Sequence, residues 1–353
     1  MIYNNMKVII LAAGIGSRLY PITKKMPKSL VRVSGREILD YQITGYIKSG
    51  ILEEQIYVIT GYLSEMIQAF LSNKYPRVNT IINSDYLTTN NMYSLYIALT
   101  EISNNTLLDF GTLIINNADC LYDESLIQEF VLCEYKNTIA CEIGTYVDES
   151  MKIVTDGNNI ITDIAKTIKS ENATGVSVDL YKYSSEAIQK LYLIIKDYIE
   201  VKKDVKQWTE VAFPVLFKEI DVYPFDVKQR KWIEVDTMDD LLQADIAFCP
   251  FEMTDKKAIV CDLDGTLYLG NKPIDSAIEF VHRNRYMYDF YFLTNNTSCP
   301  PREYVKKLAT YKLDVSEDKI CTPFIPLIRY VRNKHYKSVY LVSVYKVRIL
   351  SIF

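Results

Sequence analysis

A glycine-rich turn directly after a short apolar run constrains this chain more than any other feature. Residues Val8 to Leu11 are apolar and predict a buried first strand. Gly14 and Gly16 follow, and glycine lets a backbone turn tightly and approach a ligand closely. Backbone N–H groups in such a turn, next to the start of a helix, form a cradle for an anion. The turn therefore predicts a phosphate site at the end of the first strand.

Two basic residues belong to the same stretch. Arg18 carries a planar, permanent charge that suits phosphate oxygens, and Lys28 adds a mobile one. The dinucleotide fingerprint is excluded because it needs a glycine where Leu19 stands, and the P-loop is excluded because Ser17 is followed by arginine. A plain strand-to-helix turn with chance charges is the alternative. We expect a loop that binds a nucleoside triphosphate.

The composition is that of an ordinary globular protein. The chain has 353 residues, is 49% hydrophobic and 24% charged, and has a net charge of −4. Its length predicts two domains, and its charge gives no reason to expect a nucleic-acid partner. No run reaches the ~18 apolar residues that span a bilayer, and no signal peptide is predicted. Seven scattered cysteines without C-x-x-C spacing predict reduced thiols. We expect a cytoplasmic protein, for which the sequence leaves an oligomer open.

Apolar strands alternate with amphipathic helices from residue 6 to about residue 246. The first strands are expected at 56–60, 78–83 and 113–116, and the first helices at 38–50, 64–71 and 92–102. This rhythm predicts an α/β fold, a mostly parallel Rossmann-like sheet with helices on both faces. Ligands bind beyond the carboxyl ends of such strands, where Gly14, Gly61 and Asp119 are expected.

The pattern changes twice further along the chain. Shorter strands, a long helix and a last strand are expected at 160–164, 176–181, 185–201 and 232–235. Thr237 then opens a helix as its N-cap. A new buried strand begins after a linker. The predicted domains are residues 1–248 and 257–353, joined by a linker at 249–256.

The stretch from Leu11 to Leu30 resembles the signature of nucleotidyltransferases that activate sugar phosphates and small phosphoalcohols. Such enzymes work mainly by positioning and electrostatics, because the attacking phosphate is already an anion. Asp119 and Asp236 each end a predicted strand and resemble the family's two metal-binding aspartates; Mg²⁺ is the implied cofactor. Either aspartate is alternatively a turn or N-cap residue. The implied nucleotide-binding residues are Leu11, Ala12, Ala13, Gly14, Gly16, Ser17 and Gly61, with Arg18 and Lys28 as catalytic charges.

The segment from Asn90 to Tyr96 narrows this resemblance. It is similar to the corresponding stretch of bacterial choline-phosphate cytidylyltransferases and of relatives that activate phosphonates. The resemblance covers residues 6–246 and implies CTP as donor and a small phosphorylated or phosphonate acceptor. It implies a CDP- or CMP-linked product for a surface polymer.

The acceptor site is predicted less sharply. Lys166 resembles the family's lysine that reaches the acceptor's phosphate, and Lys152 is a rival for that role. Aromatic faces and carboxylates hold a quaternary ammonium. The candidates for substrate binding are Asn91, Tyr93, Trp208 and Glu210. A phosphonate amine, an amino-acid phosphate or glycerol phosphate would leave a similar pattern.

A second motif lies near the C-terminus. Asp262 and Asp264, in an Asp-Leu-Asp-Gly-Thr run, resemble the first motif of haloacid-dehalogenase-type phosphatases, with a nucleophile and a general acid–base. Thr294 lies in a stretch that resembles the second motif and would bind the transferring phosphate. That family also needs a downstream lysine and an acidic pair, and no acid follows Asp318. We expect a partial domain with little or no phosphatase activity of its own.

Three other functions compete with cytidylyl transfer. A sugar-1-phosphate nucleotidyltransferase using UTP or dTTP would share the same chemistry. A phosphatase would act through the C-terminal domain. A non-catalytic binding module would have Asp119 or Asp236 pointing away from the Gly14 loop.

Overall fold

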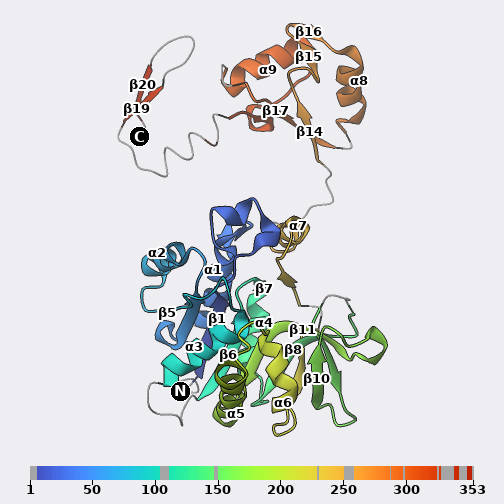
Figure 1. The fold of residues 1–353 in the computed structure, drawn as a ribbon. Coiled ribbons are helices and arrows are strands. Elements are labelled where there is room, and N and C mark those ends of the chain that lie inside the picture. The colour runs from blue at the N-terminus through green and yellow to red at the C-terminus, as the bar shows by residue number, and fades with distance from the viewer. Residues whose placement is uncertain are drawn as a thin grey trace. The chain divides into compact units, whose positions relative to one another are not determined.

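The computed structural model describes residues 6–103, 111–146, 150–228, 230–249, 258–286, 288–296, 299–323, 326, 338–341 and 348–351. The chain divides into two compact units, Met1–Pro250 and Phe251–Phe353. Figure 1 shows the elements of each unit. No helix in the described part of the chain is long and apolar enough to cross a membrane.

A nine-stranded sheet is the framework of the first unit. Its main path runs β10-β9-β11-β6-β1-β4-β5, and β8 and β12 extend it from β11. Strands β6, β1, β4 and β5 are parallel, whereas β11 runs antiparallel to β6, β8 and β9. The predicted α/β sheet is confirmed, with an antiparallel half added. The strands are β1 (Met6–Ala12), β4 (Ile56–Thr60), β5 (Asn79–Ile82), β6 (Thr112–Asn117), β8 (Thr138–Ile143), β9 (Lys152–Thr155), β10 (Ile161–Ala165), β11 (Gly175–Tyr183) and β12 (Tyr223–Asp226).

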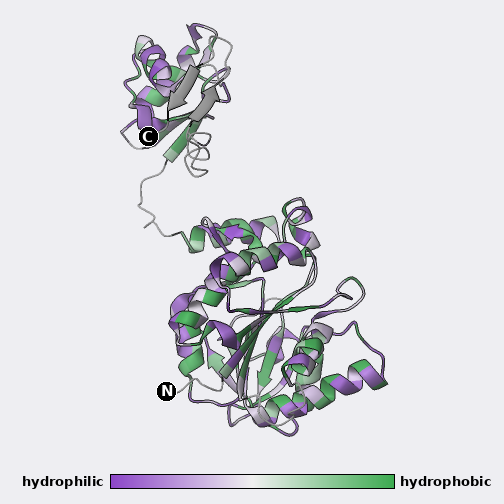
Figure 2. Ribbon diagram, turned by 90° about the vertical axis from the view of Figure 1, so that its left-hand side faces the viewer, coloured by the Kyte–Doolittle hydropathy of each residue, from purple (hydrophilic) through white to green (hydrophobic). Residues whose placement is uncertain are grey.

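Helices cover both faces of this sheet. The apolar side chains of β1 therefore point alternately into two cores, one on each face. Ile9 and Leu11 pack in the core that includes α3 and α5, while Val8 and Ile10 pack in the core that includes α1, α2 and α4. Figure 2 shows hydrophobic and hydrophilic residues interleaved along these helices, as in amphipathic segments. The helices are α1 (Ile38–Lys48), α2 (Ser64–Lys74), α3 (Asn91–Ser103), α4 (Glu124–Leu132), α5 (Ser185–Lys196), α6 (Phe213–Leu216) and α7 (Met238–Ala247).

Two local predictions need adjustment and one is confirmed. No α-helix follows the glycine-rich turn; a three-residue 3-10 helix, Ser17–Leu19, stands there instead. The long helix predicted at 185–201 is α5 followed by a π-helical turn at Asp197–Val201. Thr237 is the N-cap of α7, and its hydroxyl accepts a hydrogen bond from the Asp240 amide.

The second unit has a small sheet of its own. Its parallel strands run in the order β14-β17-β18, with bounds Ala258–Asp262, Asp289–Leu293 and Ile320–Cys321. Helices α8 (Asp275–Asn284) and α9 (Pro301–Thr310) supply its other large elements. Phe292, Leu308 and Leu263 lie in its buried core. The new strand predicted after the linker is β14, but the prediction that it is buried was wrong. Its residues are exposed or half-buried, with Val260 63% exposed, because β14 lies at the edge of this small sheet among the described residues.

Candidate active site

A cavity of about 390 Å³ opens where β1 and β6 end in the first unit. Predicted nucleotide, charge and metal residues come together along its wall. Those that line it are Leu11, Ala12, Ala13, Gly14, Gly16, Ser17, Arg18, Lys28, Asn91, Asp119, Lys166, Trp208, Glu210 and Asp236. The position beyond the carboxyl ends of parallel strands is where α/β sheets bind ligands.

The backbone of the glycine-rich turn is held by contacts that only small residues permit. Gly16 has a φ of 65°, and a Cβ there would lie 3.0 Å from the Lys28 Cβ. The Thr23 hydroxyl donates a hydrogen bond to the Gly16 carbonyl at 2.7 Å. Because only a three-residue 3-10 helix follows, any phosphate contact here depends on loop amides and side chains rather than on an α-helix dipole.

Gly61 supports the turn without lining the cavity. A Cβ at Gly61 would lie 2.8 Å from both the Ala13 carbonyl oxygen and the Tyr86 Cβ. The Tyr62 amide donates to the same Ala13 carbonyl at 3.1 Å. Gly61 therefore lets the strand β4 end pack directly against the turn, which is a different task from contacting the nucleotide.

Two aspartates distant in sequence meet through a short strand pair. Strands β7 (Cys120–Tyr122) and β13 (Trp232–Glu234) are antiparallel. The Val235 amide continues the pairing by donating to the Asp119 carbonyl at 2.9 Å. Asp119 and Asp236 thus lie at the two adjacent ends of one ladder. Both face the cavity, as a metal site beside the Gly14 loop requires.

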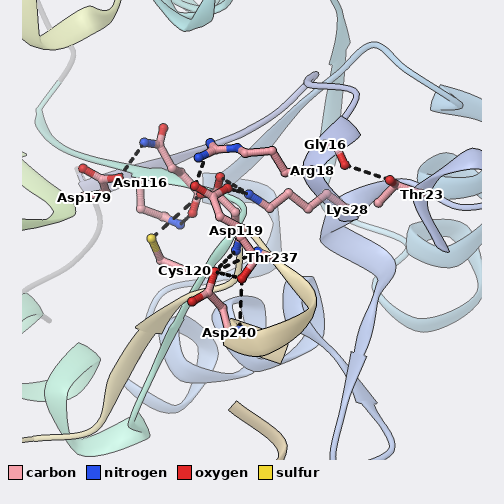
Figure 3. A network of polar contacts seen from close by, with 12 residues as sticks. Gly16, Arg18, Thr23, Lys28, Asn116, Asp119, Cys120, Asp179, Thr237 and Asp240 are labelled. Atoms are coloured by element: carbon pink, nitrogen blue, oxygen red, sulfur yellow. Dashed lines mark hydrogen bonds and ion pairs between the residues drawn. The ribbon is translucent and has the colours of Figure 1, made fainter. Parts of the chain in front are cut away.

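The Lys28 ammonium lies between these two carboxylates. It forms an ion pair with Asp119 at 2.8 Å and another with Asp236, while Arg18 contacts Asp236 at 2.6 Å. Figure 3 shows the Lys28 side chain pointing toward Asp119, with Arg18 beside it. Burial lowers the pKa of Lys28, but the two carboxylates outweigh it and raise the pKa above its usual value. Lys28 is therefore a permanent cation within the acidic site.

Glu234 completes the acidic group and was not predicted. One oxygen from each of Asp119, Glu234 and Asp236 lies within 4.8 Å of the others, an arrangement that could hold a metal ion. Burial and the charges of Asp179, Asp119 and Asp236 raise the pKa of Glu234 to about 9. The sequence could have indicated Glu234, because it lies two positions before Asp236 and residues two apart in an extended strand share a face.

Lys166 and Lys152 have different surroundings. Lys166 lines the cavity, and its ammonium lies 4.9 Å from the centre of the Trp208 ring. The Lys152 side chain is buried, and its ammonium donates to the Lys166 carbonyl at 3.0 Å. Lys152 begins β9 and Lys166 directly follows β10, and these two strands form an antiparallel pair. Lys166 is thus the lysine that the cavity exposes.

Asn90, just before α3, and Asn91, its first residue, tie this helix to the segment at 205–209 that leads to Glu210. Asn91 lines the cavity, and its side-chain oxygen accepts a hydrogen bond from the Thr209 amide at 2.9 Å. The Asn90 amide donates to the Val205 carbonyl at 3.0 Å. Tyr93 does not line the cavity, because two positions along a helix turn the side chain away. Its hydroxyl donates to Asp85 at 3.3 Å.

A second acidic pair lies on the Lys166 side of the cavity. Asp179, in β11, was not predicted, and Glu210 was. Asp179 has a φ of 58°, and the register of β11 shifts at this point. Burial is the main cause that raises the pKa of Asp179 to about 6 and that of Glu210 to about 7. A shift of register inside a strand leaves no clear sequence signal.

The second unit brings its two motifs together. Strand β14 ends at Asp262 and pairs with β17, which ends at Leu293. The Thr294 hydroxyl donates to Asp264 at 3.2 Å, and the Thr266 hydroxyl donates to Asp262 at 3.2 Å. Asp262, Asp264 and Thr294 therefore occupy adjoining strand ends.

The sequence matches two family models. Residues 7–249, more than half of the chain, match the model described as nucleotidyl transferase. The chain belongs to the nucleotidyl transferase family. Residues 259–348 match the model of haloacid dehalogenase-like hydrolases, as the motifs of the second unit predicted.

Several characterised nucleotidyl transferase relatives are similar to this chain. The choline-phosphate cytidylyltransferase of Streptococcus pneumoniae is 28% identical over 67% of this chain and 95% of that protein. The 2-aminoethylphosphonate cytidylyltransferase of Lancefieldella rimae is 29% identical over 67% of this chain and 91% of that protein. The solved CTP:phosphocholine cytidylyltransferase of S. pneumoniae shares the fold, with a TM-score of 0.58 and 24% identity, and covers 69% of this chain and 99% of that one.

Proposed function

We propose that the first unit transfers a cytidylyl group from CTP to a small acceptor that carries a phosphate or phosphonate. One observation carries the proposal: the glycine-rich turn, two cations and three carboxylates meet in one cavity of a nucleotidyl transferase. The cytidylyltransferase relatives support CTP as the donor. These relatives are named for phosphocholine, 2-aminoethylphosphonate and phosphoglutamine, which supports a small non-sugar acceptor over a hexose phosphate.

The reaction joins an acceptor oxygen to the α-phosphorus of CTP and breaks the bond to pyrophosphate. The attacking phosphate is already ionised, so no side chain has to remove a proton. We assign the turn from Leu11 to Ser17 to the triphosphate, with Arg18 and Lys28 neutralising the charge that develops on pyrophosphate. We assign Lys166 to the acceptor's phosphate, because it lines the cavity beside Trp208 and has no carboxylate partner among the described residues. A phosphoalcohol would give a CDP-linked product, and a phosphonate a CMP-linked one.

A divalent cation fits the acidic group. Asp119, Glu234 and Asp236 offer hard carboxylate oxygens close enough to share one ion, which suits Mg²⁺. Among the described residues this is the one group of three or more such donors. Bound Mg²⁺ would neutralise phosphate charge. Lys28 holds two of these carboxylates together in the absence of the cation.

The competing functions have weaker support. The phosphatase motif residues Asp262, Asp264 and Thr294 adjoin one another, but no three-carboxylate group forms around them in the described part of the second unit. A binding module without catalysis would not need Asp119 and Asp236 to face the turn. We therefore place the activity of the chain in its first unit.

The test is pyrophosphate release with Mg²⁺, pairing each of four nucleoside triphosphates with phosphocholine, 2-aminoethylphosphonate, glycerol 3-phosphate and glucose 1-phosphate. We expect release with CTP and an acceptor other than glucose 1-phosphate. Asp119→Asn should lower turnover by roughly 100-fold or more, because it removes a charge that acts on the transition state. The matched control is Asp221→Asn at an exposed position outside the cavity. Release with glucose 1-phosphate alone would assign the chain to sugar activation instead.

A further inference from the structure

Two carboxylates converge on the acceptor side of the cavity, and they share one hydroxyl group. The Tyr181 hydroxyl lies 2.9 Å from an Asp179 oxygen and 3.0 Å from a Glu210 oxygen. Glu210 is only 3% exposed, yet it lines the cavity together with Asp179. Asp179 comes from β11, and Glu210 comes from the short helix at Thr209–Ala212.

This arrangement is short of hydrogen-bond donors. Tyr181 has a single hydroxyl proton, so it can satisfy one of the two carboxylates at a time. The Ser177 hydroxyl donates to the Tyr181 oxygen at 3.3 Å and so adds no proton to the carboxylates. The Asn117 side-chain amide donates a hydrogen bond to the other Asp179 oxygen at 3.1 Å. The Glu210 backbone N–H adds one further donor to the Glu210 carboxylate. The two carboxylates still offer more acceptor positions than these donors fill, so the pair suits a ligand rich in N–H groups.

The neighbouring cation does not fill this need. Lys166 lies over the Trp208 ring, and its charge lowers the pKa of both Asp179 and Glu210 from a distance. No ion pair joins it to either carboxylate among the described residues. Lys166 and the acid pair are therefore separate groups on one wall. Together they match a small molecule with an anionic end and an N–H-bearing end.

The wall also lacks the groups that favour a methylated cation. A quaternary ammonium offers no N–H donor and binds best inside several aromatic faces. Tyr86 and Trp208 are the aromatic residues among the described lining. Tyr86 packs on Gly61 beside the glycine-rich turn, which leaves Trp208 alone near the acids, and Lys166 already lies over its ring.

We propose that the acceptor carries a primary amine at the end opposite its phosphate or phosphonate, and that Asp179 and Glu210 receive its N–H groups. This inference rests on the proposed cytidylyl transfer. A protonated amine supplies three donors, enough for both carboxylates at once. Trimethylation keeps the charge and removes every donor. A site built to hydrogen-bond an N–H group rejects the analogue that lacks it.

The experiment is a methylation series at constant charge, measured on the full chain with CTP and Mg²⁺. The acceptors are phosphoethanolamine, its N-methyl and N,N-dimethyl derivatives, and phosphocholine, with glycerol 3-phosphate as the amine-free reference. We expect kcat/KM to fall along the series, by about 100-fold in total. A flat or rising series with transfer intact would overturn the primary-amine inference alone. No transfer to any of the five acceptors would overturn the proposed function as well.

Charge-removing variants provide a second readout. Glu210→Gln should lower kcat/KM for phosphoethanolamine by about tenfold and lower that for glycerol 3-phosphate by a clearly smaller factor. Asp179→Asn, which suits the left-handed backbone there, should act in the same direction. Glu186→Gln, at an exposed position of α5, is the matched control and should change neither value. Equal losses with both acceptors would show a structural role and would contradict the proposal.

Discussion

The ammonium of Lys152 donates a hydrogen bond to the backbone carbonyl of Lys166 at 3.0 Å. The bond fixes the end of β10, from which the Lys166 side chain projects into the cavity. If Lys166 binds the acceptor as proposed, Lys152 supports that role by holding the Lys166 backbone in place.

We expect Lys152→Met to raise the KM for the acceptor about fivefold, the equivalent of one lost hydrogen bond of about 1 kcal/mol. Methionine keeps most of the buried volume, so the fold should persist. The KM for CTP should not change. Steady-state kinetics with each substrate varied would measure both values. Lys169→Met, at an exposed lysine, is the control, and an unchanged acceptor KM in Lys152→Met would remove the positioning role.

Lys28→Met should alter metal binding and turnover in opposite directions. Without the ammonium between them, Asp119 and Asp236 gain an unbalanced negative charge, which attracts a divalent cation more strongly. We expect Mn²⁺ to bind the nucleotide-free variant about tenfold more tightly, and turnover to fall by roughly 100-fold. Titration calorimetry and pyrophosphate release provide the two readouts. Lys25→Met is the exposed control. Weaker Mn²⁺ binding in Lys28→Met would contradict the idea that the Lys28 ammonium and the metal ion compete for the same two carboxylates.

Gly61→Ala should displace the backbone of the glycine-rich turn, against which Gly61 packs. The added Cβ would meet the Ala13 carbonyl and Tyr86 at 2.8 Å, so the backbone must shift. We expect a loss of about 1–3 kcal/mol in the free energy of unfolding, with a higher KM for CTP. Gly157→Ala is the matched control, because no atom lies within 4 Å of a Cβ there. Equal stability of the two variants would show that the turn tolerates the shift.

The raised pKa of Glu210 predicts a pH dependence of stability. The carboxyl titrates near 7 in the folded state and near 4.5 when unfolded, so the folded protein holds the extra proton between these values. The unfolding free energy therefore falls as pH rises from about 4.5 to 7. Asp179 shifts in the same direction, Tyr181 hydrogen-bonds to both, and Lys166 partly offsets the rise.

Glu210→Gln stays neutral across this range and should remove part of the slope. We expect its Tm to exceed that of the parent protein by more at pH 8 than at pH 5. Thermal melts of the ligand-free chain at the two pH values would measure the difference. Glu186→Gln should show no such change, and a constant Tm difference in Glu210→Gln would rule out the buried titration.

Much of the fold, and the site residues near the glycine-rich turn, could be predicted from short continuous stretches of the sequence. The run from Val8 to Leu11 predicts a strand because both faces of β1 are buried, and the same reasoning locates β4 at 56–60. Asp119 and Asp236 could be predicted because each lies close after the apolar residues of a predicted strand. Their meeting could not, since it depends on the pairing of β7 with β13.

The acceptor side was harder to predict for a physical reason. Its residues come from the bulge in β11, a strand end and a loop held by Asn91, and no single period links them. Asp179 points into the cavity because its backbone leaves the regular strand conformation at φ 58°. Tyr93 illustrates the converse: an aromatic in a suggestive motif lies on another side of α3.

Strand β6 pairs with β1 in parallel and with β11 antiparallel, so the cavity is lined by residues from a parallel and an antiparallel half of the sheet. The glycine-rich turn follows β1 in the parallel half, whereas Lys166 follows β10 and Asp179 lies in β11, both in the antiparallel half. New acceptor preferences could thus arise by exchanging residues 150–210 while the donor half stays intact. If the proposed cytidylyl transfer is correct, the antiparallel half of the sheet could change acceptor preference in evolution while the parallel half, with the glycine-rich turn, stays the same.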